Sequence, residues 1–416
     1  MRKPSALVIF LTVFIDLIGF GIVLPLLPLY SDSFHAKGWL IGVIQASFSA
    51  MQFLFAPWWG RLSDRIGRRP VLLVSTAGAA ISYTIFAYGC TLHDSRGLWI
   101  LLGSRILAGI CGANITVAQA YIADISPPEE RSKKMGLIGM AFGLGFVFGP
   151  PIGILGISMF GLSGPGIVAA ILCALNFVFT FLVLPESWKP TSEHAAQRPR
   201  MEQFLQTLKH PQIGLLVLVF FLATFCFASF ETTLGLLIRK NFHLTTINHQ
   251  DMKMSGYLIA YCGIIGALVQ GGATGRLVKK QGEPRVIANS LILLAIGLAP
   301  IPFLGGQGWL MWTLLLIALA VLAIGSSLTR PPVFGMISIL TPANEQGGTI
   351  GVAQSAGSLA RIFAPIFAAG LLDVYPPLPY LICSVIAMFT AFLVIKKLCH
   401  SSFAPIGGGA AVSTAV

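Results

Sequence analysis

Charged residues are scarce in this sequence: Asp, Glu, Lys and Arg make up only 10% of its 416 residues, whereas 55% are hydrophobic. Soluble domains have about 25% charged residues. The shortage therefore excludes an ordinary soluble protein and predicts an integral membrane protein. The formal net charge of +12 does not indicate a nucleic-acid partner, because the basic residues lie between apolar runs and not in one basic patch.

Cysteine is also scarce, and a nucleotide-binding motif is missing. The seven Cys residues lie in or beside apolar stretches, and none forms a C-x-x-C pair or has a His at ligand spacing. This argues against a metal site or a disulfide framework. The G-x-x-x-x-G-K-[ST] loop that binds ATP phosphates is absent as well. We therefore expect no cofactor and no metal, and an ion or substrate gradient as the source of energy.

What the sequence does contain is a series of long apolar runs. A helix needs roughly 20 apolar residues to cross the bilayer core, and the first run is too long for a cleavable signal peptide. The sequence predicts an all-α polytopic membrane protein with twelve transmembrane helices in two six-helix bundles. The predicted spans are 6–30, 39–58, 71–91, 98–122, 135–157, 165–185, 213–238, 254–275, 286–304, 309–328, 349–371 and 378–395.

The loops between these runs predict the topology. Twenty of the 27 Lys and Arg residues fall in loops on the side of the N-terminus, Arg330 among them, and five fall in loops on the other side. Since cationic loops stay in the cytoplasm, we expect a multi-pass protein of the inner (plasma) membrane with both termini cytoplasmic. The predicted parts are an N-terminal half at 1–185, a cytoplasmic linker at 186–212, a C-terminal half at 213–396 and a disordered tail at 397–416.

The two halves share an internal repeat. A shift of 215 residues aligns GRLSDRIGRRPV at 60–71 with GRLVKKQGEPRV later in the chain. The same shift pairs Gly136 with Gly351 and Asp16 with Glu231. One offset that serves separate windows indicates duplication of a six-helix unit, and transporters with such repeats bind substrate near the bilayer midplane.

Four charged residues stand inside predicted spans: Asp16, Arg105, Glu231 and Arg361. A charge at the centre of a span costs about 2.5–3.5 kcal/mol on insertion scales, so it usually faces a cavity and has a partner. We interpret Asp16, Arg105 and Glu231 as proton-coupling residues, because burial and a nearby arginine act in opposite directions on a carboxyl group. Glu231 is either a second proton site or a contact for a cationic substrate. Purely structural pairing of these charges is the alternative.

Polar side chains in the spans predict a substrate cavity. Hydrogen bonds between helices are the alternative explanation for each of them. The candidate cavity residues are Gln45, Asn114, Gln119, Tyr257, Tyr261, Gln354 and Arg361.

The loop GRLSDRIGRRP at 60–70 predicts a gate. The positive-inside pattern explains its arginines but neither its glycines nor Asp64. A carboxylate there can cap a helix N-terminus or pair with an arginine of the other half, as a latch that breaks when the halves move. The candidate gating residues are Gly60, Asp64, Arg65, Gly67, Arg68 and Arg69.

This loop resembles the G-x-L-x-D-R-x-G-R-R motif of the major facilitator superfamily. Two further segments are similar to the drug:proton antiporters of that superfamily: RILAGICGA, in which Arg105 and Gly109 match R-x-x-x-G, and GFVFGPPIG at 145–153, which matches G-x-x-x-G-P-x-x-G. The antiporter signature normally ends in a second Gly after Gly153, and Ile154 departs from it. The signature segment predicts a hinge helix with Gly145, Gly149, Pro150 and Gly153.

The first span resembles helix 1 of the tetracycline-efflux group, in which an acid precedes glycines and prolines, here Asp16, Gly19, Gly21, Pro25 and Pro28. The resemblance extends to about residue 396. Those exporters are expected to carry a His in helix 8 and an Asp in helix 9 for coupling. Here every His lies in a loop or terminus, and the predicted helix 9 has no acid. Coupling would therefore shift to Asp16 and Glu231, and the substrate stays open.

Together these features predict a secondary active transporter, not an enzyme. It would export small apolar or amphiphilic compounds, drug- or tetracycline-like, in exchange for protons by alternating access. The expected partners are a small-molecule substrate, protons and membrane lipid, without nucleic acid, and we expect a monomer. A facilitator or symporter of the same fold, for a nutrient or a lipid-like molecule, is the first alternative. A membrane-embedded enzyme or sensor is a remote one, because the spans contain no catalytic cluster.

Overall fold

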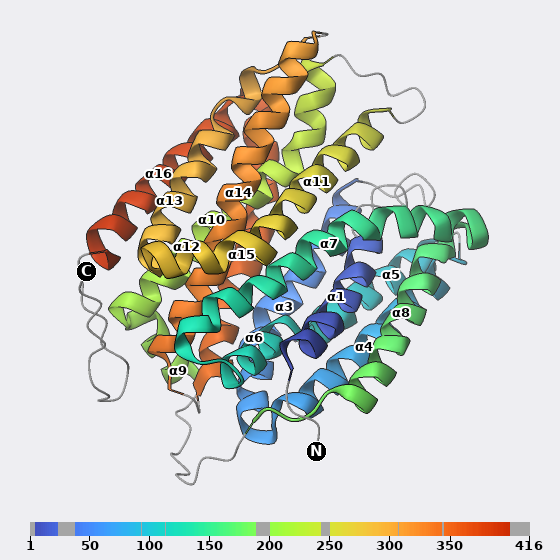
Figure 1. The fold of residues 1–416 in the computed structure, drawn as a ribbon. Coiled ribbons are helices and arrows are strands. Elements are labelled where there is room, and N and C mark those ends of the chain that lie inside the picture. Colours follow the sequence, from blue (N-terminus) through green and yellow to red (C-terminus); the bar gives the residue numbers. More distant parts are fainter. Residues whose placement is uncertain are drawn as a thin grey trace. The chain divides into compact units, whose positions relative to one another are not determined.

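The computed structural model describes residues 5–23, 38–92, 94–112, 114–188, 200–242, 250–306, 308–342 and 345–399. Within these ranges all regular secondary structure is helical (Figure 1), which confirms the predicted all-α fold. Pro25, Pro28 and the predicted tail beyond residue 399 lie outside the described residues.

The described helices fall into two series joined by a short helix. The first series is α1 Ala6–Val23, α3 Gly38–Ile66, α4 Arg68–Gly89, α5 Ser95–Cys111 with α6 Asn114–Asp124, α7 Pro128–Phe160 and α8 Gly164–Val183. The second is α10 Pro211–Asn241, α11 Gln250–Leu268 with the π-helical turn η4 Val269–Ala273 and α12 Thr274–Gln281, α13 Glu283–Leu298, α14 Trp309–Leu340, α15 Gln346–Val374 and α16 Leu378–Leu398. Helix α9, Arg200–Lys209, lies in the predicted linker.

Ten stretches of the described chain are long and apolar enough to cross a membrane. One of them, Pro128–Val183, contains both α7 and α8. Helix α3 is not among the ten, and its last turns carry the polar residues of the 60–66 segment. With α7 and α8 separated and α3 included, the described helices account for the twelve predicted spans.

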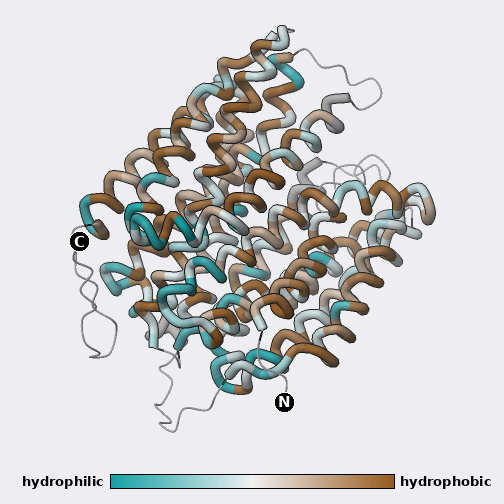
Figure 2. The backbone as a smooth tube through the Cα atoms, in the orientation of Figure 1, coloured by the Kyte–Doolittle hydropathy of each residue, from teal (hydrophilic) through white to brown (hydrophobic). Residues whose placement is uncertain are grey.

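Several helices extend beyond the apolar runs that predicted them. Helix α14 continues to Leu340, whereas its predicted span ends at residue 328. A helix satisfies its backbone hydrogen bonds internally, so a fall in hydropathy marks the edge of the apolar layer and not the end of the helix. Apolar residues follow the helices along most of their length, and hydrophilic residues gather toward helix ends (Figure 2).

Helix α9 is followed directly by α10, and His210 joins them. The Nδ1 atom of His210 accepts a hydrogen bond from the backbone N–H of Ile213 at 3.3 Å and so caps α10. Partial burial lowers the pKa of His210. The imidazole is therefore kept neutral, as a ring nitrogen that accepts a hydrogen bond must be.

Contacts between residues divide the chain into two units. Unit 1 consists of Met1–Pro127, Leu144–Phe204 and Ala343–Ser358; unit 2 consists of Pro128–Gly143, Leu205–Pro342 and Leu359–Val416. Each unit thus takes one helical segment from the other half of the chain. The two exchanged segments, 128–143 and 343–358, are related by the same 215-residue shift as the sequence repeat.

The turns that the repeat aligns have the same backbone geometry. Gly67 precedes α4 with φ 100° and ψ 163°, and Gly282 precedes α13 with φ 78° and ψ 156°. A positive φ disfavours residues with a Cβ atom, which explains glycine in both halves. A Cβ atom at Gly136 or at Gly351 would lie 2.7 Å from a backbone oxygen of a neighbouring helix in its own unit. The sequence repeat is therefore also a structural repeat.

Helix α7, the predicted hinge helix, is in close contact with α1 in unit 1. A Cβ atom at Gly149 would overlap the backbone of Gly21, and one at Gly145 would lie 2.8 Å from a backbone oxygen of α1. Gly153 is buried as well. Small residues at this spacing let two membrane helices approach closely. Pro150 lies inside α7, where a proline removes one backbone hydrogen bond and bends the helix.

We expect Gly149→Val to lower the melting temperature of the purified protein, because the new side chain has no room beside Gly21. Overpacking of this kind costs about 1–3 kcal/mol. Gly103→Val is the matched control, since a Cβ atom at Gly103 meets nothing within 4 Å. Thermal unfolding in detergent measures both variants, and equal melting temperatures would contradict the close contact.

Candidate functional site

Asp16 lies well inside α1 and is partly buried. At 1.5 Å per residue it is roughly 15 Å from the start of the helix, which is about half the thickness of the bilayer core. The thiol of Cys173 on α8 donates a hydrogen bond to Oδ1 of Asp16 at 3.6 Å. A thiol is a weak donor, so this contact does not hold the carboxyl group in its charged form as an ion pair would.

Asn176 keeps α8 in place beside this carboxyl group. Its Nδ2 atom donates to the backbone oxygen of Thr12 on α1 at 2.8 Å. The hydroxyls of Thr12 and Thr180 lie 3.4 Å apart one turn further on. These contacts fix the register of α1 and α8, which places Cys173 next to Asp16.

Arg105 on α5 is buried near the same carboxyl group. Its guanidinium carbon lies 5.2 Å from the ring centroid of Tyr83 and 5.0 Å from that of Phe86, both on α4. Aromatic faces stabilise a desolvated cation. Tyr83 interacts electrostatically with both Asp16 and Arg105. The first two predicted proton-coupling residues therefore share a tyrosine neighbour, and a direct ion pair between them stays a prediction.

Glu231 and Arg361 come together in unit 2. Glu231 on α10 and Arg361 on α15 are partly buried and lie within electrostatic range of each other. The guanidinium carbon of Arg361 is 5.6 Å from the ring centroid of Phe142 on α7. Glu231 thus has an opposite charge of its own unit within electrostatic range, and a direct ion pair between the two stays a prediction.

Arg330 stands beside this pair and was not among the predicted site residues. Its guanidinium carbon lies 4.7 Å from the ring centroid of Phe142, 5.6 Å from that of Phe220 and 5.8 Å from that of Phe334. It is close enough to Arg361 for the two charges to repel each other. The sequence analysis assigned Arg330 to a loop, whereas it lies inside α14. The apolar sequence that resumes after the two following prolines is the signal that would have found it.

Two predicted cavity residues meet in unit 1. The Nε2 atom of Gln354 on α15 donates to Oε1 of Gln119 on α6 at 2.7 Å. One turn along α15, the hydroxyl of Ser358 donates to Oε1 of Gln52 at 3.0 Å. These contacts are hydrogen bonds between helices, the alternative considered for the polar residues.

The remaining predicted cavity residues are spread over several environments. The hydroxyl of Tyr261 on α11 donates to the backbone oxygen of Leu316 at 3.3 Å. Tyr257, one turn earlier, is 69% exposed. The side chains of Gln45 and Asn114 lie outside the described residues.

Arg68 is the centre of a buried charge network at the turn between α3 and α4. Its Nη1 atom lies 2.5 Å from Oδ1 of Asp64, and its Nε atom lies 3.0 Å from Oδ2 of Asp124 on α6. Arg68 is fully buried and Asp64 is only 5% exposed. Buried charges of this kind need partners to offset their loss of hydration. The sequence predicted Asp64 and Arg68 but not Asp124.

Asp64 also caps the first turn of α15. Its Oδ1 atom accepts from the backbone N–H of Gly347 at 3.0 Å, and its Oδ2 atom accepts from that of Gly348 at 2.9 Å. A carboxylate is stabilised at the positive end of a helix. Gly60 permits this approach, because a Cβ atom there would overlap the backbone of Gly347. Capping was one of the two roles considered for Asp64, and here it occurs within unit 1.

Glu186 holds the other side of the same turn. Its two oxygens accept from the backbone N–H groups of Arg68 at 2.9 Å and Arg69 at 3.0 Å, which caps α4. A Cβ atom at Gly67 would lie 2.6 Å from Glu186, so glycine leaves room for the carboxylate. Arg65, by contrast, is exposed. Apart from Arg65, the predicted gating residues thus lie at one network. It is completed by two carboxylates, at residues 124 and 186, that the sequence analysis did not identify.

The described helices account for the twelve predicted spans, belong to two repeated halves and carry isolated charges inside the apolar layer. These features define a polytopic membrane transporter. The chain belongs to the Major Facilitator Superfamily, whose sequence profile matches residues 9–365 and 275–398. This confirms the superfamily resemblance seen in the sequence. Transport, and not catalysis, is the activity of this fold and of the relatives.

Three relatives illustrate the similarity. The tetracycline resistance protein, class C, of Escherichia coli is 33% identical over 385 residues, which are 89% of this chain and 90% of that protein. Multidrug resistance protein 2 of Bacillus subtilis (strain 168) is 28% identical over 402 residues, with 95% and 94% coverage. The crystal structure of the human organic anion transporter MFSD10 (TETRAN) superposes with a TM-score of 0.78 at 25% identity, and covers 94% of this chain and 100% of that one.

Proposed function

We propose that this transporter exports small amphiphilic, drug-like compounds in exchange for protons. Asp16 carries the proton, Arg105 tunes its affinity for the proton, and the charged cluster of unit 2 receives the substrate. The proposal includes a monomer in the inner (plasma) membrane with both termini in the cytoplasm, where the basic loops remain.

The observation that carries the proton exchange is the environment of Asp16. A carboxyl group halfway through a membrane helix, in contact with a thiol donor, is costly to keep charged and gains little from its neighbour. Such a group can take up and release a proton as solvent access changes. The tetracycline and multidrug resistance relatives support export as the direction.

The charges of unit 2 favour a substrate with a negative group. Two arginines of that unit, Arg330 and Arg361, lie close enough to repel each other, and both lie against the ring of Phe142. Two neighbouring cations against Phe rings are suited to an aromatic or amphiphilic anion. The relative described as an organic anion transporter supports the same substrate class. This revises the cationic contact that the sequence alone suggested for Glu231.

Arg330→Gln should raise the KM for aromatic carboxylates about tenfold, since a hydrogen bond to a charged group is lost. Neutral compounds should keep their KM. Both KM values are measured from proton movement in proteoliposomes, followed with a pH-sensitive dye. The compounds added are aromatic carboxylates, lipophilic cations, tetracyclines and neutral drugs. Arg239→Gln is the matched control, because Arg239 is exposed at the end of α10. An equal rise in KM for anions and for neutral compounds would show that Arg330 has a structural role only.

The same assay separates the proposal from a facilitator or symporter. In an exporter driven by protons, the protons cross the membrane in the direction opposite to the substrate, and the pH of the lumen changes accordingly. Substrate movement without proton movement would favour the facilitator, and movement of both in one direction would favour the symporter.

A further inference from the structure

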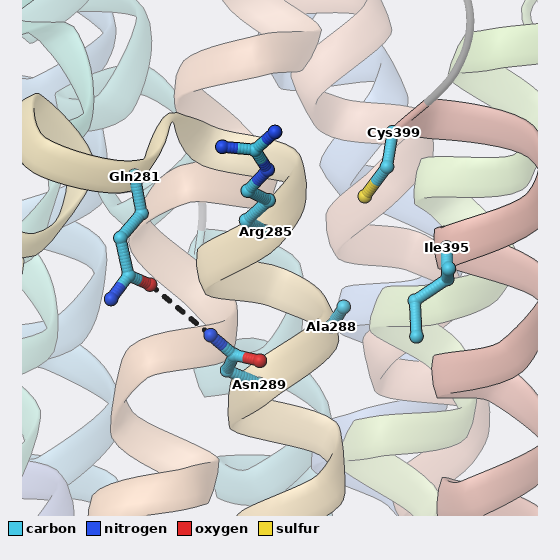
Figure 3. A pocket seen from close by; sticks show the side chains of 6 residues that line it. All are labelled: Gln281, Arg285, Ala288, Asn289, Ile395 and Cys399. Carbon is cyan, nitrogen blue, oxygen red and sulfur yellow. Dashed lines mark hydrogen bonds between the residues drawn. The ribbon is translucent and has the colours of Figure 1, made fainter.

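A cavity of about 330 Å³ lies at one end of unit 2, where α12 meets α13 and α16. It is lined by Gln281, Arg285, Ala288, Asn289, Ile395 and Cys399 (Figure 3). The polar side chains come from α12 and α13, and the apolar wall comes mainly from α16. Neither the proton site nor the charged cluster of unit 2 includes any of these residues.

The polar wall holds one arginine, Arg285, that forms no ion pair within the described part of the chain. Asn289 donates to Oε1 of Gln281 at 3.1 Å, so these two amides are joined (Figure 3). Among the described residues, no carboxylate lies within ion-pair distance of Arg285. The acid nearest in sequence, Glu283, accepts a hydrogen bond from Ser132 on α7. The Arg285 guanidinium is therefore available to an anion from outside the protein.

Further cations surround the cavity. Lys279 and Lys280 stand in the last turn of α12, and Lys396 and Lys397 stand in the last turn of α16. All four are exposed. Basic pockets between transmembrane helices on the cytoplasmic side are typical sites for anionic lipid headgroups, and the positive-inside pattern predicts that this end is cytoplasmic.

Exposed apolar side chains continue from the cavity along α16. On α16, Val385, Met388, Phe392 and Ile395 are 68%, 46%, 57% and 39% exposed and follow each other at a spacing of three or four residues. This spacing puts them on one face of the helix, which leads to Cys399 in the cavity.

Helix α13 packs beside α16. The hydroxyl of Ser384 on α16 donates to the backbone oxygen of Ala295 on α13 at 2.9 Å, so the two helices are in contact. Along α13, Arg285 and Asn289 are followed by Ile296, which is 54% exposed. From Arg285 to Ile296 the helix rises roughly 16 Å, close to the ~15 Å depth of one leaflet.

We propose that the cavity, together with the exposed apolar face of α16 that follows it, binds an anionic phospholipid. The phosphate group lies against Arg285, the amides of Gln281 and Asn289 contact the glycerol or headgroup, and an acyl chain lies along the exposed apolar side chains of α16. Along this surface a charged group is followed by polar and then by apolar side chains, which is the order of groups along a phospholipid. A free phosphate ester would use only the polar end.

The test is lipid retention by the purified full chain in native mass spectrometry. The protein is titrated with phosphatidylglycerol, phosphatidylcholine and glycerol phosphate. We expect phosphatidylglycerol to bind at least tenfold more tightly than the other two, and Arg285→Gln to lower its affinity about tenfold, as expected for one charge-assisted contact. Arg285→Lys keeps the charge and should retain most of the affinity.

Lys396→Gln is the matched control, because it removes an exposed cation next to the cavity that does not line it. Equal loss in Arg285→Gln and Lys396→Gln would mean general attraction to a basic surface and would overturn the site. Equal binding of glycerol phosphate and phosphatidylglycerol would overturn the lipid as occupant. Proton flux is not part of this readout, so failure here leaves the proposed transport function untouched.

Discussion

Asp16→Asn is expected to abolish substrate-evoked proton flux while substrate exchange across the membrane continues. Asn has the same size and still accepts the hydrogen bond from Cys173, but it cannot carry a proton. Transport driven by a pH gradient should therefore fall to the level of liposomes without protein. A pH-sensitive dye and counterflow of labelled substrate measure the two activities in the same preparation.

Two controls make this result specific. Asp94→Asn changes an exposed acid that caps α5, and Asn can accept the same backbone hydrogen bonds, so flux should be unchanged. Glu231→Gln separates its two roles: a second proton site lowers the number of protons per substrate, whereas a structural partner of Arg361 lowers stability instead. If compounds are transported and neither Asp16→Asn nor Glu231→Gln alters proton flux, these acids are structural and the facilitator becomes the leading interpretation.

Arg68→Gln should destabilise the protein more than any other substitution in the turn between α3 and α4. It leaves the buried carboxylate of Asp64 and the carboxylate of Asp124, whose side chain is 13% exposed, without their shared cation. Removal of one partner from a buried ion pair costs about 3–5 kcal/mol. The melting temperature in detergent should fall markedly, and transport should fall with it if the network is the gate.

Arg65→Gln is the matched control, because Arg65 belongs to the same motif but is exposed. Exposed charges contribute about 0–1 kcal/mol, so its melting temperature should change little. Arg68→Lys keeps the positive charge but cannot reach both carboxylates in the same way, and should be intermediate. Equal stability of Arg68→Gln and Arg65→Gln would contradict the buried network.

The fold could be predicted from the sequence because lipid imposes a simple rule. Every backbone polar group must be satisfied within a helix, so each apolar run of sufficient length indicates one span. The repeat was readable for a similar reason: Gly67 and Gly282 share a backbone geometry that only glycine adopts easily. The end of α14 and the presence of α9 could not be predicted from apolar runs, because polar residues can also continue a helix or form one.

Part of the site could be predicted for an energetic reason. A charge in an apolar run is expensive, so Asp16, Arg105, Glu231 and Arg361 stand out without any structure. Arg330 did not, because it follows the end of its apolar run and precedes two prolines. Only the helix that continues through those prolines places it beside Phe142.

By itself the sequence determined the membrane class, the number of spans, the duplicated halves and the acids and bases that the apolar layer has to accommodate. The tertiary structure alone decided the partners of those groups: Cys173 for Asp16, Asp124 for Arg68 and the start of α15 for Asp64. The physical reason is that the free-energy cost of burying a charge depends on the residue type and on the apolar sequence around it. The contacts that offset the cost come from helices far apart in the chain, which only packing brings together.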